Sequence, residues 1–580
     1  MFKKLLIANR GEIAVRVIRA CRDLDISAVA VYSDLDAEAV HTRLADEAFN
    51  VGPGPATESY LNIPAVVDAA KRSGAEAVHP GYGFLAENGD FARAVIDAGL
   101  EWVGPAPDVI DSMGDKTAAR AAASDAGVAT VPGTKQPVTQ VDEVTAFASE
   151  NGLPIAIKAS AGGGGKGFRV VNKHEDIEDA MTGASREAQA YFSSPDVYLE
   201  KYLERPRHIE VQVLGDATGA VLSFPERDCS LQRRHQKLVE ESPSPALDPA
   251  VREAIMEAAA KVSKQVGYRN AGTCEFLLDS DGRTFYFLEM NTRLQVEHPV
   301  TELVTGIDLV VAQLLIAAGE GLGFSQDDIS LHGHAMECRI NAEDPARKFM
   351  PAPGSIGNYR EPAGSGVRVD SGLEPNSTVP QAYDPMIAKV ITYGASRDQA
   401  RRRMLRALSE YEIEGLKTTI PFHRLMLADD RFIAGDYHTG TVEREMDLSS
   451  LADTAASKPK AGEPAIATRH FGIEINGKRF EVTAREHLES VVLRSKPKPP
   501  KGIGALGGGS GETLHAPMQG TIVKVLVEQG QQVSAGETIY VLEAMKMENS
   551  ILAHSDGVVE ELKVSAGQSV ETGATIAIIR

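Results

Sequence analysis

The chain has 580 residues, a length that predicts about three or four domains. Hydrophobic residues make up 43% and charged residues 24%, a composition typical of globular proteins. The formal net charge of −21 argues against broad binding to nucleic acid or anionic membranes, which requires a basic surface. The four cysteines form no CxxC or CxxH cluster, so we expect neither a zinc site nor a disulfide framework.

The chain shows no targeting or membrane signal. The N-terminus reaches Asn9, Arg10 and Glu12 too soon for a signal peptide. The most apolar later stretch, residues 309–319, covers only about half of a membrane span. We therefore expect a cytoplasmic protein that does not enter a membrane.

The N-terminal part alternates strand and helix, which predicts a parallel sheet. Residues 4–8 form an apolar strand, residues 12–24 a helix, and residues 28–32 and 75–78 further strands. The turn after the first strand, residues 9–12, reads Asn-Arg-Gly-Glu. It lacks the GxGxxG that brings backbone close to a pyrophosphate, so a nicotinamide enzyme is disfavoured.

The composition changes after about Met446. Residues 449–462 are typical of a solvated linker, and residues 472–482 alternate around Asn-Gly, which predicts a type I′ hairpin. This hairpin could dock a partner subunit or only stiffen the linker. Residues 496–511 are Pro-rich and then Gly/Ser-rich, a tether that could span roughly 50 Å when extended.

The last 70 residues contain an internal repeat. Eight positions recur 37 residues later, pairing Gly520, Ile522, Val525, Val527, Gly530, Val533, Gly536 and Ile539 with Gly557, Val559, Leu562, Val564, Gly567, Val570, Gly573 and Ile576. Two copies of one strand pattern predict a small two-fold-symmetric β-sandwich. Residues 543–549 interrupt the repeat, and we expect them to form a hairpin turn on the symmetry axis that exposes Lys546.

A glycine run, residues 161–167, follows a strand that ends in Lys158. It is not a Walker A loop, because neither Ser nor Thr follows Lys166. Its N–H groups could fold over phosphates, with Lys158 and Lys116 supplying positive charge. Taken alone, the run is equally compatible with a plain flexible loop.

Two carboxylates are placed to hold a divalent cation. Residues 276–279 and 284–289 are predicted strands joined around Asp281-Gly282, an arrangement that sets Glu275 opposite Glu289. Facing carboxylates repel across a sheet, and a cation between them would remove the repulsion. Mg²⁺ (or Mn²⁺) takes one or two carboxylates together with phosphate oxygens.

The second of these strands suggests a third ligand. By period-two alternation we expect Phe285, Phe287, Glu289 and Asn291 to share one face. Asn291 would then add a side-chain oxygen to the cation site.

Several motifs together resemble the biotin-dependent carboxylases. The matching segments are residues 7–14 (IANRGEIA), 79–83 (HPGYG), 227–237 (RDCSLQRRHQK) and 290–299 (MNTRLQVEHP). Residues 544–547, Ala-Met-Lys-Met, resemble the biotinyl domain of these enzymes, whereas lipoyl domains usually carry acidic and small neighbours. The closest resemblance is to bacterial acyl-CoA carboxylase α-subunits, which join a biotin carboxylase to a biotin carboxyl carrier domain.

The resemblance implies an α/β ATP-grasp enzyme followed by an all-β, lipoyl-like sandwich. The expected N-terminal Rossmann-like domain spans residues 1–112, and the ATP-grasp and C-terminal carboxylase domain spans 113–447, with a lid at about 130–203. A linker with a small hairpin would occupy residues 448–511, and the biotinyl carrier domain residues 512–580.

The resemblance also implies roles for matching residues. ATP would contact Lys116, Lys158, Gly163, Gly164, Gly165, Lys166, Gly167, Glu200, Leu203, His208, Gln232 and His235. Bicarbonate would contact Lys237, Arg293, Gln295 and Val296. Mg²⁺ would be held by Glu275, Glu289 and Asn291. Glu297 is the implied general base, Arg339 the group that stabilises anionic intermediates, and Lys546 the site of biotin attachment.

The implied function is that of a ligase. ATP would activate bicarbonate as carboxyphosphate, and the CO₂ released would carboxylate biotin on Lys546, which a biotin protein ligase attaches. The carboxybiotin would pass to a separate carboxyltransferase β-subunit acting on an acyl-CoA of the acetyl- or propionyl-CoA class, as in fatty acid biosynthesis. We expect a homo-oligomer within a larger α/β complex.

Three alternatives fit the sequence less well. Only about 65 residues separate the enzyme from the carrier, too few for the transferase domain of a pyruvate carboxylase. Another ATP-grasp ligase would leave the carrier without purpose. An inactive scaffold would have lost Glu275, Glu289, Arg293 or Glu297, and all are present. Cys229 could be reactive, although a buried structural thiol is the better interpretation.

Overall fold

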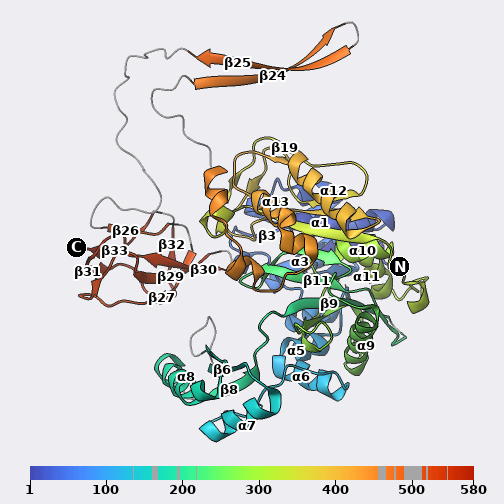
Figure 1. The fold of residues 1–580 in the computed structure, drawn as a ribbon. Coiled ribbons are helices and arrows are strands. Elements are labelled where there is room, and N and C mark those ends of the chain that lie inside the picture. Colours follow the sequence, from blue (N-terminus) through green and yellow to red (C-terminus); the bar gives the residue numbers. More distant parts are fainter. Residues whose placement is uncertain are drawn as a thin grey trace. The chain divides into compact units, whose positions relative to one another are not determined.

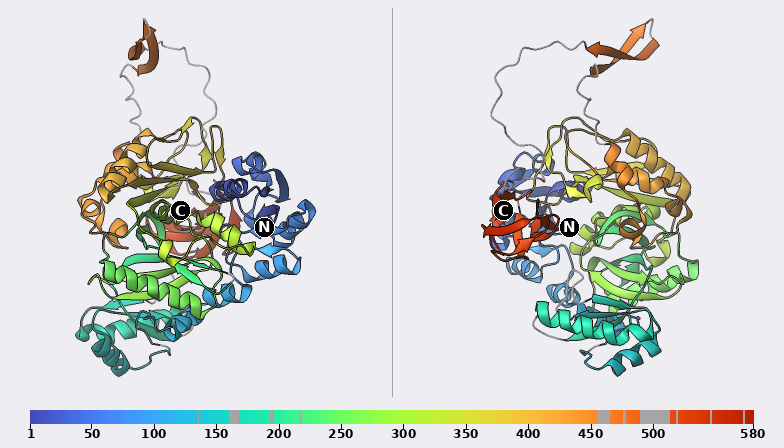
Figure 2. Two further views of the ribbon diagram at one scale, coloured as in Figure 1. Left: turned by 90° about the vertical axis from the view of Figure 1, so that its right-hand side faces the viewer. Right: turned by 60° about the vertical axis from the view of Figure 1, so that its left-hand side comes forward.

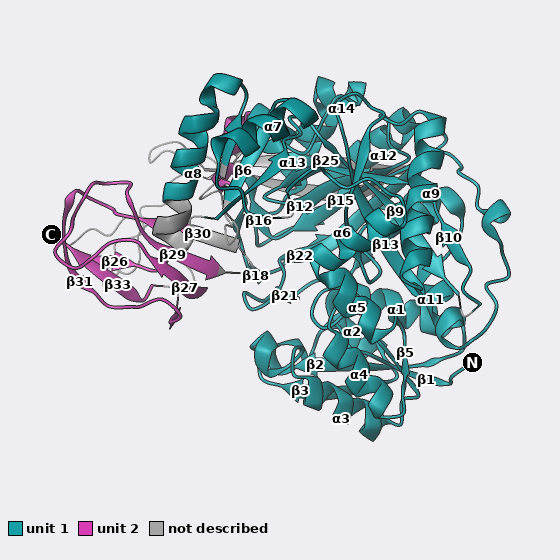
Figure 3. Ribbon diagram, turned by 90° about the horizontal axis from the view of Figure 1, so that it is seen from below, with its two compact units in different colours: residues 1–345, 349–446 teal, residues 346–348, 447–580 magenta. Residues whose placement is uncertain are grey.

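The computed structural model describes the chain except for residues 135, 160–167, 193–195, 217, 455–464, 476–477, 489–512, 518–519, 545–546 and 572. It divides into two compact units (Figure 3). The large unit comprises residues 1–345 and 349–446, and the small unit comprises residues 346–348 and 447–580.

The N-terminal sheet is parallel, as the sequence predicts, with the order β3-β2-β1-β4-β5. Its elements are β1 (Lys4–Ile7), α1 (Gly11–Asp23), β2 (Ser27–Ser33), α2 (Val40–Leu44), β3 (Glu47–Gly52), α3 (Ile63–Ser73), β4 (Ala77–His79), α4 (Gly89–Asp97), β5 (Glu101–Trp102) and α5 (Pro107–Gly114). Along β1, Leu5 and Ile7 pack with α1, while Leu6 packs in a different core with α3 and α4. Helices therefore cover both faces of the sheet, which is why Leu5, Leu6 and Ile7 of β1 are all apolar.

A nine-stranded sheet forms the centre of the large unit. Its path is β14-β13-β9-β11-β12-β15-β22-β20, with β10 added beside β9, and the neighbours along it are antiparallel. The strands are β9 (Arg207–Gly215), β10 (Val221–Ser223), β11 (Arg227–Arg233), β12 (Gln236–Ser242), β13 (Asn270–Leu278), β14 (Phe285–Asn291), β15 (His334–Asn341), β20 (Val367–Ser371) and β22 (Met386–Gly394). The helices around them are α6 (Lys116–Asp125), α9 (Pro249–Gln265), α10 (His298–Thr305), α11 (Leu309–Ala317), α12 (Arg397–Glu410), α13 (Ile420–Ala428) and α14 (Asp430–Ala434).

A small α/β lid has its own core. It contains α7 (Val141–Asn151), β6 (Ile155–Ala159), β7 (Phe168–Val171), α8 (Ile177–Phe192) and β8 (Val197–Lys201), with strand order β7-β6-β8. Ile157, Val171 and Leu199 pack there with Val144 of α7. The lid, coloured teal, stands at one end of the large unit (Figures 1 and 2).

No single helix among the described residues is long and apolar enough to cross a bilayer. The pair α10 and α11 meets the length and composition criteria only when taken together, and the two helices are bent by 96° at their junction. Both helices lie mostly inside the large unit, where Val300, Val304, Leu309 and Leu314 are buried.

The predicted linker hairpin is present and longer than expected. Strand β24 (Ala465–Ile475) pairs antiparallel with β25 (Lys478–Leu488), from Ala465 opposite Leu488 to Ile475 opposite Lys478. The predicted turn residues, Asn476 and Gly477, lie outside the described residues. β-Branched residues continue on both sides of the predicted segment, which favours the longer strands.

The C-terminal sandwich confirms the 37-residue repeat. Its sheets have the orders β26-β33-β31-β28 and β30-β29-β27-β32. The strands are β26 (Thr513–His515), β27 (Gly520–Val525), β28 (Gln532–Val533), β29 (Thr538–Ala544), β30 (Met547–Leu552), β31 (Gly557–Leu562), β32 (Ser569–Val570) and β33 (Thr575–Ile579). Each copy gives its short strand to the other copy's sheet, because β28 pairs with β31 and β32 pairs with β27.

The registers of the two copies correspond residue by residue. Val541 lies opposite Ser550, and 37 positions on Ile578 lies opposite Thr513. The symmetry mate of the β29–β30 connection is therefore the break between β33 and β26. Our expectation that this turn lies on the symmetry axis is wrong, because a point on the axis would be its own mate. Met545 and Lys546, which join Ala544 to Met547, lie outside the described residues.

Candidate active site

Strand β9 brings polar side chains into the interior of the central sheet. Ile209, Val211 and Val213 pack in an apolar core, while His208 and Glu210, which alternate with them, are buried with their polar atoms on the opposite face. His208 Nε2 lies 3.2 Å from Glu275 Oε2 on β13. Burial alone would lower the pKa of His208, but Glu275 and Glu210 raise it to about 9.

Glu275 and Glu289 lie directly opposite each other on β13 and β14, as predicted. Burial, and then the charge of Glu275, raise the pKa of Glu289, so their mutual repulsion is only partly relieved. Asn291 Nδ2 donates to Glu275 Oε1 at 2.9 Å, which places a third oxygen-bearing side chain beside the pair. Two carboxylates and an amide are a donor set that fits Mg²⁺.

The predicted alternation along β14 is wrong. The register shifts between the Glu275–Glu289 pair and the Phe276–Phe287 pair, so the strand contains a β-bulge at Leu288. Met290 therefore packs in the same apolar core as Phe287, and Glu289 lies on the other face.

Lys237 on β12 is the centre of the charged cluster. Its ammonium group lies 2.5 Å from Glu210 Oε2, 2.9 Å from Glu275 Oε1 and 2.7 Å from Glu297 Oε1, which uses all three of its N–H donors. Burial alone would lower the pKa of Lys237, but these carboxylates raise it well above its ordinary value. Lys237 is therefore a fixed positive charge.

Glu297 lies just before α10 and is 2% exposed. Its Oε1 accepts from Lys237 Nζ at 2.7 Å, and its Oε2 accepts from Arg339 Nη2 at 2.8 Å. Burial and Glu210 would raise the pKa of Glu297, but Lys237, Arg339 and Arg227 lower it below its ordinary value. The structure thus holds a buried carboxylate in its ionised form.

Arg339 on β15 also contacts Glu240 on β12. Its Nε donates to Glu240 Oε1 at 2.5 Å, and Glu337 lies opposite Glu240 on the neighbouring strand. Burial raises the pKa of Glu240 to about 7 and that of Glu337 well above its ordinary value. Burial thus disfavours the charged forms of Glu240 and Glu337, whereas the pKa of Glu297, the other partner of Arg339, is lowered.

The segment around Arg293 reaches the same cluster. Gln295 Nε2 donates to Glu275 Oε1 at 2.8 Å, and the Val296 carbonyl accepts from Lys389 Nζ at 2.8 Å. Arg293 Nε donates to Glu87 Oε2 at 2.8 Å. The ion pair between Arg293 and Glu297 that their spacing would allow is not among the described contacts, because Glu297 is bound to Lys237 and Arg339.

The residues expected to bind ATP are divided between lid and sheet. In the lid, Lys158 of β6 donates to Glu200 of β8, which also accepts from Arg120 at 3.3 Å. Lys116 is exposed in the first turn of α6. The predicted glycine loop, with Gly163, Gly164, Gly165, Lys166 and Gly167, lies outside the described residues.

The β11–β12 hairpin carries two further expected ATP contacts. Gln232 pairs with Lys237 across the hairpin. Between the strands, Arg234 and His235 have φ values of 48° and 64°, the left-handed pair that a type I′ turn requires. Leu203 is buried beside the end of the lid.

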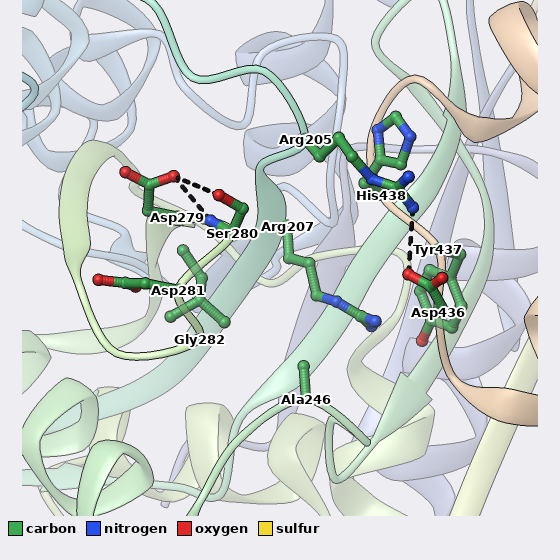
Figure 4. A pocket seen from close by; sticks show the side chains of 11 residues that line it. Arg205, Arg207, Ala246, Asp279, Ser280, Asp281, Gly282, Asp436, Tyr437 and His438 are labelled. Carbon is green, nitrogen blue, oxygen red and sulfur yellow. Dashed lines mark hydrogen bonds and ion pairs between the residues drawn. The ribbon is translucent and has the colours of Figure 1, made fainter.

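A cavity of about 260 Å³ lies elsewhere in the large unit (Figure 4). Arg205 and Arg207 line it with their side chains directed toward Asp436, and the hairpin residues Asp279 and Asp281 lie on the other side. Arg205 pairs with Asp436 at 3.1 Å, and Arg207 is bound to buried Asp228 at 3.1 Å. Both of its arginines are engaged in ion pairs, and it includes none of the predicted site residues.

Four family models match the chain. They are described as the biotin carboxylase N-terminal domain (residues 1–110), the carbamoyl-phosphate synthase L chain ATP-binding domain (115–324), the biotin carboxylase C-terminal domain (337–444) and the biotin-requiring enzyme domain (512–579). The alpha3 subunit of a biotin-dependent acyl-coenzyme A carboxylase from Mycobacterium leprae is 49% identical, over 100% of this chain and 98% of that protein. The chain belongs to the biotin-dependent acyl-CoA carboxylase α-subunits.

Other relatives agree with this family. The mitochondrial propionyl-CoA carboxylase alpha chain of mouse is 40% identical, over 99% of this chain and 91% of the mouse protein. The biotin carboxylase domain of the 2-oxoglutarate carboxylase of Hydrogenobacter thermophilus, solved with ADP, its magnesium salt and bicarbonate, is 48% identical with a TM-score of 0.68. It covers 76% of this chain, and the match covers 97% of that domain. The expected ATP-grasp fold with a biotinyl sandwich is confirmed, and the α-subunit is a ligase that carboxylates biotin with ATP.

Sequence reasoning missed Arg227, although it lies in a quoted motif. Its side chain is fully buried and donates to Glu210, Gln212, Thr273, Gln295 and Thr301. Glu210 was missed as well. The sequence of β9 carries no signal for this burial, because polar residues that alternate with Ile and Val are also what a strand with one solvent-facing side shows.

Proposed function

We propose that Glu297, Lys237 and Arg339 form the centre at which the α-subunit activates bicarbonate. The observation that carries this proposal is the buried, ionised carboxylate of Glu297 between two cations. An ionised carboxylate can accept the bicarbonate proton, and water has little access to it there. The proton acceptor and the two positive charges would then face one substrate.

Anion binding follows from the same contacts. Lys237 and Arg339 stay charged and are held in place by carboxylates on three strands and one loop, so both cations already lie at this centre. Bicarbonate would take the place of one of the three carboxylate contacts of Lys237. Arg293, Gln295 and the Val296 backbone would complete the bicarbonate site. Carboxyphosphate would break its C–O bond to give CO₂ and phosphate, and this phosphate would take the proton of the ureido nitrogen of biotin. Arg339 would stabilise the resulting anion until it attacks the CO₂.

Nucleotide and metal would bind beside this centre. Glu275, Glu289 and Asn291 would hold Mg²⁺ (or Mn²⁺), which offsets phosphate charge during transfer. ATP would lie between lid and sheet, in contact with the twelve residues that the resemblance indicates, among them Lys158, Glu200 and His208. The Hydrogenobacter thermophilus domain, whose structure contains magnesium ADP and bicarbonate, supports this placement.

We propose Lys546 as the lysine to which a biotin protein ligase attaches biotin. The repeat supports this assignment. Among the described strands of the sandwich, the β29–β30 connection is the one that joins the first copy of the repeat to the second. A streptavidin blot tests it. Biotin should be present on the wild-type chain and absent from Lys546→Ala, and biotin that persists in the variant would exclude this lysine.

The carboxyl group would then pass to a carboxyltransferase β-subunit within an α/β complex containing several α-subunits. Acyl-CoA carboxylase relatives over the full chain support an acyl-CoA of the acetyl- or propionyl-CoA class as acceptor. The β24–β25 hairpin is our candidate for contact with that partner. Four free, buried cysteines support a reducing cytoplasm.

Bicarbonate-dependent ATP hydrolysis stimulated by free biotin tests the catalytic assignment without the partner. We expect Glu297→Gln to lose the bicarbonate-dependent rate by about 10²-fold or more, since general base catalysis contributes that much. Glu241→Gln is the control, because Glu241 is equally buried but binds His334 and Arg397 instead of the cluster. Retained activity in Glu297→Gln would show that another group is the base.

A further inference from the structure

The N-terminal motif around Asn9 has no role in the site as described so far. It follows β1 at the point where the strand order reverses between β1 and β4, the place where open α/β sheets usually bind a ligand. Asn9 Nδ2 instead donates to the carbonyl oxygens of Pro80 at 2.7 Å and Tyr82 at 2.8 Å. The motif thus ties together the ends of β1 and β4.

Glu12 of the same motif contacts a lysine from the central sheet. Lys389 on β22 is fully buried, and its Nζ lies 3.3 Å from Glu12 Oε1 and 3.9 Å from Asp370 Oδ2. The ammonium also lies 5.8 Å from the centre of the Tyr82 ring. The segments that follow β1 and β4 therefore both approach one cation from another part of the large unit.

The shortest contact of Lys389 is with the proposed bicarbonate segment. Nζ donates to the Val296 carbonyl oxygen at 2.8 Å. That carbonyl belongs to the peptide bond joining Val296 to Glu297, whose side chain reaches Lys237 and Arg339. Because the peptide unit is planar, fixing its oxygen also fixes the direction in which the chain enters Glu297.

We propose that Lys389, supported by Glu12, is a positioning residue that fixes the Val296–Glu297 peptide for bicarbonate activation. This inference rests on the proposed function, because it assumes that Glu297 and Val296 meet bicarbonate. It also gives the N-terminal motif a role, since the motif supplies the carboxylate that keeps a buried ammonium against the bicarbonate segment.

A purely structural role for the pair is the competing interpretation. Buried ion pairs add little net stability, since the cost of desolvating both charges offsets their attraction. A pair that only joined two domains could be replaced by apolar residues of similar size without loss of function. The bond to Val296, which is shorter than the contact with Glu12, favours a role in positioning.

The double variant Glu12→Gln/Lys389→Met separates the two interpretations. It removes both charges together, so that neither member of the pair is left as an isolated buried charge, while the bond to Val296 is lost. In the full-length α-subunit we expect kcat/KM for bicarbonate, measured by ATP hydrolysis with free biotin, to fall roughly 10- to 100-fold. KM for ATP should not change, because Lys389 contacts none of the proposed nucleotide-binding residues in the described contacts.

Glu241→Gln is the matched control for the loss of a buried charge. It should lower the Tm and leave KM for bicarbonate unchanged, since Glu241 binds His334, Arg397 and Tyr437. The single variant Lys389→Arg, in which Glu12 is kept, should recover part of the lost bicarbonate efficiency, because its guanidinium can still donate to Val296.

Two results would overturn the proposal. One is a folded double variant with wild-type kcat/KM for bicarbonate. The other is an equal loss for bicarbonate and ATP together with a lowered Tm, which would indicate structural support alone. Failure of the proposed function would look different, because Glu297→Gln would then keep its bicarbonate-dependent rate whatever the Lys389 variants do.

Discussion

Replacing Arg227 by lysine should destabilise the large unit although the charge is kept. The five N–H groups of Arg227 donate to five different buried acceptors, at 2.5 Å to Glu210, 3.1 Å to Gln212, 3.0 Å to Thr301, 3.2 Å to Thr273 and 2.9 Å to Gln295. A lysine has three donors on one nitrogen, so at least two acceptors lose their partner. Each buried group left unpaired costs about 1–3 kcal/mol, which gives about 2–6 kcal/mol in total.

Thermal unfolding followed by circular dichroism measures this loss. We expect the Tm of the large unit to fall on the order of 5–10 °C in Arg227→Lys. The control is Arg360→Lys, because Arg360 makes a solvent-exposed ion pair with Glu412 and should shift stability by less than about 0.5 kcal/mol. KM for bicarbonate should rise in Arg227→Lys as well, since Gln295 loses one of its two bonds. Equal Tm values for the two variants would refute the donor count as the source of stability.

Three further predictions concern other parts of the chain. Burial, partly offset by Lys389, raises the pKa of Glu12 to about 7 from 4.5, so the folded state holds the Glu12 proton more tightly than the unfolded chain does, and Glu12 faces Lys389 as a carboxylate above about pH 7. The stabilisation from the protonated Glu12 side chain is fully present below pH 4.5 and is lost as the pH rises through 7. Glu12→Gln, which does not titrate, should therefore gain up to about 3 kcal/mol of unfolding free energy relative to wild type between pH 5 and pH 8 in denaturant titrations. A pH-independent difference would contradict this. Cys229 is fully buried and its pKa is raised well above the ordinary value, so iodoacetamide should not label it in the native protein. Rapid labelling, measured by mass spectrometry, would show that solvent reaches this thiol. Ile539→Ala and Ile576→Ala, at symmetry-related and fully buried positions, should each cost about 2–5 kcal/mol in the carrier's unfolding transition, and a large difference between them would show that the two halves are not energetically equivalent.

Features that depend on local pattern could be predicted from the sequence. The parallel N-terminal sheet follows from apolar runs separated by one amphipathic helix, and the opposition of Glu275 and Glu289 follows from a turn signal between two strands. The sandwich follows from a repeat whose period survives in every strand pairing of the two halves. In each case, the residues that decide the structure lie near one another along the chain.

Features that depend on contacts between distant segments could not be predicted. The bulge at Leu288 changes which side chains of β14 are buried, and no residue in the strand marks it. Arg227 and Lys389 find partners 15 to 377 positions away, so their sequence context does not distinguish them from surface cations. The residue roles implied by the resemblance remain predictions, although the structure brings Lys237, Glu275 and Glu297 into one cluster.

The internal repeat of the carrier sandwich decides at which end the preceding part of the chain enters it. Because β33 and β26 pair as β29 and β30 do, the chain enters the sandwich on the far side of the pseudo-two-fold axis from the β29–β30 connection. In Figure 1, β30 and the C-terminal end accordingly lie at opposite ends of the sandwich. With biotin at the proposed lysine, the site of modification and the point where the chain enters would lie at opposite ends of the sandwich. A small rotation of the sandwich about the point where the chain enters would then displace the proposed biotinyl lysine by a larger distance. The length of the sandwich would thus add to the distance that carboxybiotin can travel.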